Sequence, residues 1–314
     1  MVHSTVKEVE LDAVSSLTFF VQGIRKYKYF ILAFSVLTMI ASVFYAISLP
    51  NIYRSEAQLV PVTSSSNSGL SGMLNQLGGL ASVAGISLDG GKGKDTYRIE
   101  ESIKSRDFLI DFINKHKLKP YLFATKEWQQ ESNTLILDHE IYDKNNNWIR
   151  DVKYPKKKTP TDEEAYEKFR EIFNVTYIRK KNLFKLSIDF YSPLIAQEWL
   201  SELIKDFNHY NRINELAEIN RNLDFLKKYI ETTELKEIQQ TAFALIEEQM
   251  RALMLAKSKA EYTLETIQSA YIPEKKYSPS RALICIGLSV LGFILATVTF
   301  LIVYGLRLSK HSVK

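Results

Sequence analysis

Two long apolar runs without charge, one near each end, constrain the fold of this chain more than any other feature. The C-terminal run, residues 282–306, contains no Asp, Glu, Lys or Arg and lies between Arg281 and Arg307. The N-terminal run, residues 29–49, is equally free of charge, and Pro50 follows it. A helix of about 20 apolar residues can cross the hydrocarbon core of a membrane. Both runs therefore predict transmembrane helices.

The first run could also belong to a cleaved signal peptide. Signal peptides have apolar segments of about 7–15 residues behind a short charged leader, whereas this run is longer and begins only at residue 29. We therefore interpret it as a retained span. Arg25, Lys26 and Lys28 precede it, and basic residues favour the cytoplasmic side. Both termini, residues 1–28 and 307–314, are then predicted to be cytoplasmic, and residues 50–281 form one external domain, which is periplasmic in a bacterium.

Charge balance and cysteine content exclude some classes of protein. The 36 acidic residues nearly balance the 41 basic ones. No basic stripe with interleaved aromatic residues is present, so we expect no nucleic-acid partner. The single cysteine, Cys285, lies inside the C-terminal apolar run, and an intrachain disulfide is therefore excluded.

Catalytic motifs are also missing from the sequence. The five histidines are scattered, and neither HExxH nor the Cys/His spacing of a metal site occurs. No nucleophile elbow is present. Carboxylate pairs such as Glu163–Glu164 and Glu247–Glu248 are expected on solvated helix surfaces. We therefore expect no enzyme activity, no catalytic residues, no cofactor and no metal site.

The first half of the external domain mixes strands and helices. Residues 51–62 alternate apolar and polar side chains, which predicts a strand. Residues 64–93 are rich in Ser and Gly and predict a loop with one short helix. The stretch GISLDGGKGKDT inside this loop lacks the hydroxyl residue that a phosphate-binding loop requires. Residues 96–117 predict one or two amphipathic helices that end before Pro120.

A helix and a hairpin are expected next. The helix should begin at Asp162, with Thr161 before it, because apolar residues then recur at helical spacing. Residues 174–190 alternate on both sides of a polar turn at residues 180–182, which predicts a β-hairpin.

A long helix is the most specific prediction for this domain. No Gly or Pro occurs between Leu194 and Ile272, and apolar residues recur at alternating steps of three and four. Such a stripe is typical of coiled-coil-like packing. At 1.5 Å per residue, residues 194–230 would span about 55 Å, more than a small core can cover. We expect a projecting helical hairpin over about residues 194–258 that breaks at residues 231–233, where β-branched residues are adjacent.

The stripe predicts an interface between copies of the chain. In the alternative arrangement, the ascending and descending helices pair within one chain through the same residues. A last strand within residues 261–272 should pair with the first strand. The expected fold is an α+β domain, made of a small mixed sheet with helices and a long projecting helical hairpin, between two transmembrane helices. The predicted interface residues are Leu200, Leu203, Phe207, Leu216, Leu223 and Leu226.

Proline motifs next to both spans suggest a family. Pro273-x4-Ser278-Pro279 precedes the second span, and Pro50-x2-Tyr53-x3-Ala57-x-Leu59-x-Pro61 follows the first. In this order, and with two spans around a coiled external domain, the motifs resemble the chain length determinant family, the Wzz-type polysaccharide co-polymerases, over essentially the whole chain. The chain departs from the family pattern at Ala270, which stands in place of a first proline, and at Ser280–Arg281, which replaces the usual Pro-Lys continuation.

The resemblance implies a bacterial inner-membrane protein that sets the modal length of a lipid-linked polysaccharide, commonly the O-antigen of lipopolysaccharide, made by a membrane polymerase. It also implies a ring-shaped homo-oligomer with an α+β base and long projecting helices, and a regulator rather than an enzyme. Some relatives carry or recruit a cytoplasmic tyrosine kinase. Because the sequence stops at Lys314, we expect no fused kinase here.

The proline motif has a physical interpretation of its own. Proline fixes φ and biases the preceding residue toward extended conformations. Pro273, Ser278 and Pro279, with Arg281 after them, therefore predict a stiff, extended entry into the bilayer that takes part in length control. The plainer alternative is a helix stop before a span.

Small residues in the second span suggest close helix packing. Gly292-x3-Ala296 is a small-xxx-small pattern that lets transmembrane helices approach closely, and Gly287 is a second glycine of the same run.

Two other functional classes compete with length control. One is a two-span periplasmic sensor or adaptor that signals through a separate cytoplasmic partner. The other is a periplasmic or membrane enzyme, which the missing catalytic motifs disfavour.

Overall fold

The computed structural model describes residue 25 and residues 28–62, 90–153, 155–233 and 235–312. These form two compact units, a two-helix unit (residues 1–51 and 277–314) and a sheet domain (residues 52–276). Residues 64–89 of the expected Ser- and Gly-rich loop, and the first part of its phosphate-loop-like stretch, lie outside the described residues.

The two-helix unit contains both predicted spans. The first is the helix Lys28–Ser48, and the second lies in α9 (Arg281–Ser312), where residues 281–303 are the most apolar. Only 17% and 11% of the residues in their most apolar stretches are buried, whereas the core helix of a soluble protein is mostly buried. The protein therefore has two helices suited to crossing a membrane, at the positions expected from the sequence.

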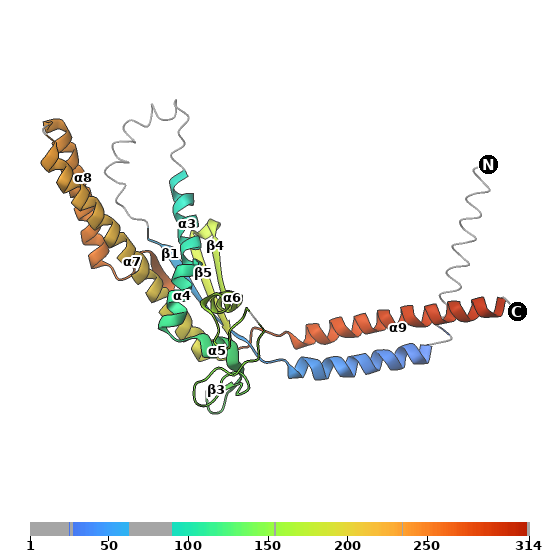
Figure 1. Ribbon diagram of the computed structural model, residues 1–314. Helices are drawn as coiled ribbons and strands as arrows, with labels where there is room; N and C mark the ends of the chain where they lie inside the picture. Colours follow the sequence, from blue (N-terminus) through green and yellow to red (C-terminus); the bar gives the residue numbers. More distant parts are fainter. Residues whose placement is uncertain (1–24, 26–27, 63–89, 154, 234, 313–314) are drawn as a thin grey trace, which may run out of the picture. The chain divides into compact units, whose positions relative to one another are not determined.

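A four-stranded sheet forms the base of the sheet domain (Figure 1). Its strands are β1 (Tyr53–Pro61), β4 (Phe173–Ile178), β5 (Leu183–Phe190) and β6 (Leu264–Gln268), in the order β4-β5-β1-β6. All three pairings are antiparallel, so the expectation of a mixed sheet was wrong. The reason is topological: β5 and β6 run in the same direction, but β1 lies between them. The predicted hairpin and the pairing of the last strand with the first are confirmed.

One face of the sheet is apolar and the other is polar. Ala57 pairs with Leu186 and Leu59 pairs with Phe184, and all four side chains are fully buried. On the other face, Arg54 donates two hydrogen bonds of 2.6 Å to the carboxylate of Asp189. This alternation is typical of an antiparallel sheet with one face on the core.

Short helices complete the core. They are α3 (Gly90–Ile103), α4 (Arg106–Lys115), α5 (Lys119–Ala124) and α6 (Asp162–Ile172). Thr161 and Glu164 form a capping box at the start of α6, which confirms the predicted start. The sequence analysis missed α5 and the small sheet of β2 (Thr125–Gln129) and β3 (Thr134–Leu137). Pro120 was interpreted as a helix stop, but it lies in the first turn of α5, where proline is favoured.

The long helical hairpin is present (Figure 1). It consists of α7 (Pro193–Thr232) and α8 (Lys236–Ser258), which lie side by side. The 40 residues of α7 give a length of about 60 Å. Ser192 caps its start, and Thr233 is extended and ends it. The predicted break at residues 231–233 is therefore confirmed.

A buried asparagine links α7 to the edge strand β6. The side-chain amide of Asn208 donates to the carbonyl of Leu264 at 2.9 Å. Its oxygen accepts the backbone N–H groups of Thr263 and Leu264, each at 2.9 Å. Asn208 is only 3% exposed. It thus satisfies backbone groups at the start of β6 that would otherwise be buried without partners.

Candidate functional site

The proline segment leaves the sheet domain from a fixed point. Pro273 is buried. Just before it, the Ser55 hydroxyl donates to the carbonyl of Tyr271 at 2.8 Å, and the Gln197 amide donates to the carbonyl of Ala270 at 3.4 Å. Residues 273–280 contain no helix, and α9 begins at Arg281. The Ser278–Pro279 peptide bond is cis.

Arg281 connects the two helices of the two-helix unit at one end. Its guanidinium donates to the carbonyl of Leu49 at 3.4 Å and to the side-chain oxygen of Asn51 at 3.2 Å. Its Nε is buried, with no hydrogen-bond partner in the described part of the chain. Arg281 therefore holds the start of the second span against the end of the first, a role that its position in the sequence did not reveal.

The small residues of α9 differ in their surroundings. A Cβ at Gly292 would lie 2.8 Å from the Cβ of Thr38 in the first span, closer than side chains tolerate. Ala296, one turn further, is 2% exposed and packs with Ile31. Gly287 has open space around it. The two helices therefore approach each other most closely near Gly292 and Ala296, as the small-xxx-small pattern suggests, and Gly287 takes no part.

The predicted interface stripe lies largely inside one chain. Leu200, Leu203 and Phe207 are fully buried in the core of the sheet domain, so they are not exposed ridges available to a second copy. Leu223, in the second half of α7, is 5% exposed. Leu216 and Leu226 are half-buried. The first half of α7 packs on the sheet and the second half packs on α8. The apolar stripe of α7 is therefore covered within one chain, although it is longer than the core of the sheet domain.

Other apolar side chains of the hairpin are exposed. Phe225 and Tyr229 stack on each other along α7, with ring centroids 6.0 Å apart, and Phe225 is 66% exposed. The sequence analysis missed these residues because the regular stripe marks the side of the helix that faces the core. We call the following set the exposed hairpin surface: Ile213, Phe225, Tyr229, Leu235, Phe243, Leu245, Met250 and Met254.

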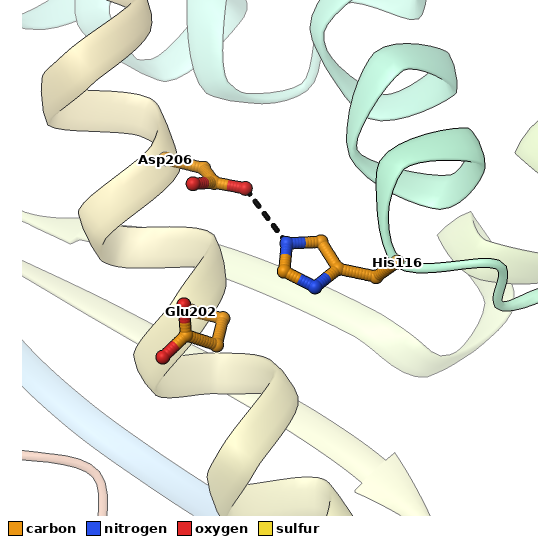
Figure 2. A group of neighbouring side chains, drawn as sticks. All are labelled: His116, Glu202 and Asp206. Carbon is orange, nitrogen blue, oxygen red and sulfur yellow. Dashed lines mark hydrogen bonds and ion pairs between the residues drawn. The ribbon is translucent and has the colours of Figure 1, made fainter.

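Three side chains that can bind metal ions meet between α4 and α7 (Figure 2). His116 is the C-cap residue of α4, and Glu202 and Asp206 lie one turn apart on α7. Their ligand atoms all lie within 4.8 Å of one another. The Nε2 of His116 is 2.8 Å from a carboxylate oxygen of Asp206, and the imidazole packs on the ring of Phe112, with centroids 4.6 Å apart.

Two lysines contact the same carboxylates. Lys115 donates to Asp206 at 2.6 Å, and Lys205 donates to Glu202 at 2.7 Å. Partial burial favours the neutral form of Asp206, but the hydrogen bonds from Lys115 and His116 outweigh it and hold the pKa of Asp206 below its ordinary value. The carboxylate is therefore ionised near neutral pH. The sequence analysis missed this group because His116 and Asp206 are 90 positions apart; the four-residue spacing of Glu202 and Asp206 was the one local signal.

Comparison with known proteins finds one family model that matches part of the chain. The family described as Chain length determinant protein (Wzz) matches residues 16–116. The match covers less than half of the chain, from before the first span through α4, and it confirms the resemblance noted in the sequence over that part only. It includes the motif from Pro50 to Pro61, whereas the motif from Pro273 to Pro279 lies outside it. No curated protein sequence matches the chain.

Two solved structures are similar to this chain. One is a full-length bacterial polysaccharide co-polymerase, with 11% identity and a TM-score of 0.34, over 91% of this chain and 97% of that chain. The other is a fragment of WzzB, a polysaccharide co-polymerase from Salmonella Typhimurium, with 13% identity and a TM-score of 0.30, over 73% of this chain and 100% of that chain. The family match, rather than these two likenesses, is the starting point for the function.

Proposed function

We propose that this protein, whose residues 16–116 match the chain length determinant proteins, regulates the length of a bacterial surface polysaccharide without catalysing a reaction itself. The family match is the single observation that carries the proposal. The polymer is a lipid-linked polysaccharide, the O-antigen of lipopolysaccharide in the most specific form of the proposal. The partner is the membrane polymerase that extends it.

The proposed location is the bacterial inner membrane. Two apolar, largely exposed helices support a protein that crosses the membrane twice. Arg25, Lys26 and Lys28 before the first span favour cytoplasmic termini, which supports the proposal that the sheet domain lies in the periplasm.

Deletion of the gene tests the function directly. We expect the surface polysaccharide, separated on a gel, to lose its preferred length and show a broad distribution, which the wild-type gene restores. An unchanged band pattern would reject length control. It would favour the competing interpretation, a two-span sensor or adaptor with a separate cytoplasmic partner.

We also propose that copies of the chain assemble into a ring through the exposed hairpin surface. Its side chains are apolar and unusually exposed for a folded domain, as Phe225, Phe243 and Met254 illustrate at 66%, 57% and 62%. Phe225 and Tyr229 also stack on each other, and exposed apolar surface of neighbouring side chains commonly marks a protein interface. In a closed ring each contact joins two different faces of the chain, and α7 and α8 present such faces along one hairpin.

Replacing Phe225 and Phe243 with serine should convert the oligomer into folded monomers. Burial of each phenylalanine contributes roughly 1.5–3 kcal/mol, and the contact repeats around the ring. Native mass in detergent measures the assembly, and circular dichroism measures the helix content. Tyr97→Ser is the control, because Tyr97 is 66% exposed but lies on α3. An intact oligomer of the double variant would contradict this interface. Leu203→Lys, in contrast, should unfold the sheet domain, because Leu203 is fully buried.

The proline segment should control length beyond anchoring the chain. Replacing Pro273 and Pro279 with alanine removes two fixed φ angles from the segment between β6 and α9. We expect an altered polysaccharide length distribution with normal protein level and membrane insertion. Pro155→Ala, at an exposed proline elsewhere in the domain, is the matched control and should leave the distribution unchanged. If the double variant inserts normally and its polysaccharide lengths match those of the wild type, the segment is only a helix stop before the span.

A further inference from the structure

We propose that His116, Glu202 and Asp206 form a binding site for a divalent metal ion of the zinc type, which joins α4 to α7 (Figure 2). The proposal is independent of length control. It rests on how three side chains from two helices converge, and it assigns a ligand to a part of the sheet domain for which the proposed function gives no role.

The positions of the three residues suit a metal ion. Glu202 and Asp206 are four residues apart on α7, so their carboxylates lie on one face of the helix. His116 reaches the same place from the end of α4, and Phe112 supports its ring. Zinc binds histidine nitrogen and carboxylate oxygen at about 2.0–2.2 Å, which places tetrahedral ligand atoms about 3.3 Å apart. The ligand atoms here lie within 4.8 Å of one another, so they must move closer by up to about 1.5 Å to bind one ion.

The ligand types select the class of ion. One imidazole and two carboxylates favour zinc and its neighbours among the transition metals. Magnesium and calcium prefer sites built from oxygen alone. Three protein ligands leave one position of a tetrahedral ion for water.

Glu202 is the residue that distinguishes a metal site from a simple ion pair between the two helices. His116 and Asp206 already contact each other, and this pair alone would connect α4 to α7. Glu202 contributes nothing to that pair, since its oxygen accepts from Lys205. One of its carboxylate oxygens nevertheless lies within 4.8 Å of the ligand atoms of that pair. A metal ion uses Glu202, whereas the ion pair does not.

The neighbouring lysines are competitors that a metal ion must displace. The side chain of Lys115 is 54% exposed and that of Lys205 is 69% exposed, so both ammonium groups can turn into solvent. Lys115 contacts Asp206 directly, at 2.6 Å. Removing it should therefore strengthen metal binding, which is the opposite of what the loss of a ligand does.

The test uses the full-length protein in detergent, stripped with a chelator and titrated with Zn²⁺ by calorimetry and with Co²⁺ by its visible absorption. We expect one site per chain and a higher unfolding temperature with Zn²⁺. Glu202→Gln and His116→Gln should each weaken binding by more than about tenfold, an effect at least as large as that of losing an outer-shell partner. Lys115→Ala should tighten it roughly twofold to fivefold, the range that a partly exposed ion pair supports.

Two other residues of α7 provide the control variants for this test. Glu198→Gln and His209→Gln change exposed residues of the same types on α7 and should leave binding unchanged. Circular dichroism checks the fold of every variant, and the gain expected for Lys115→Ala cannot result from unfolding. The proposal fails if the wild-type protein binds no Zn²⁺, which leaves the ion pair alone. It also fails if Glu202→Gln binds as tightly as the wild type, or if all variants bind alike.

Discussion

Asn208→Leu should lower the free energy of unfolding of the sheet domain by roughly 3 kcal/mol or more. The substitution removes the partners of two N–H groups and one carbonyl at the start of β6. Each buried polar group left unpaired costs about 1–3 kcal/mol. For a domain of this size, a loss of about 3 kcal/mol corresponds to a fall in unfolding temperature of roughly 6–12 °C. Thermal unfolding followed by circular dichroism measures it.

Asn211→Leu is the matched control for this prediction. Asn211 lies one turn further along α7, and its amide donates to the carbonyl of Phe207, which is an acceptor inside the helix already. Its loss should cost less than about 1 kcal/mol. Equal unfolding temperatures for the two variants would show that Asn208 does not hold β6 in place.

Gly292→Leu should separate the two membrane helices. The new side chain would meet Thr38, and rotation of Thr38 cannot relieve the contact because its Cβ is itself 2.8 Å from the added Cβ. Overpacking of this kind costs about 1–3 kcal/mol, a roughly fivefold or greater loss of the packed arrangement. Gly287→Leu is the control, since that position has open space. A changed polysaccharide length distribution should accompany the separation.

A disulfide between the two helices measures their packing. The sulfur of Cys285 lies 3.8 Å from the carbonyl oxygen of Ser42, so Ser42→Cys introduces a second cysteine where the two helices are in contact. We expect efficient cross-linking in this background and with Gly287→Leu, and weak cross-linking with Gly292→Leu. Equal yields in all three proteins would rule out the close approach at Gly292.

Local signals in the sequence predicted most of the elements. The start of α6 behind Thr161, the start of the long helix near residue 194 and the β-branched pair at its end depend on residues that are close in sequence, so each could be located in advance. The stripe along α7 was also recognised. Its role was not, because periodicity shows that a face is covered without showing what covers it. Leu203 is covered by the sheet of its own chain.

The features that the sequence did not reveal depend on distant residues. Asn208 is 56 positions from Leu264, and His116 is 90 positions from Asp206. An asparagine inside a helix, or a single histidine after the end of a helix, has no sequence pattern from which its contact residue can be predicted. Arg281 is a similar case, since its contact with Leu49 exists only once the two spans pack together. Such residues become recognisable when the fold brings them together.

The single helix α7 acts as a lever. Its first turns are fixed in the core by Leu200, Leu203 and Phe207, and its remaining turns extend beyond the sheet with α8. Over the roughly 38 Å from Phe207 to Thr232, a rotation of about 5° at the base moves the far end by about 3 Å. The position of the hairpin tip is thus set by side chains far from it, and small changes in the core are magnified where copies of the chain would meet.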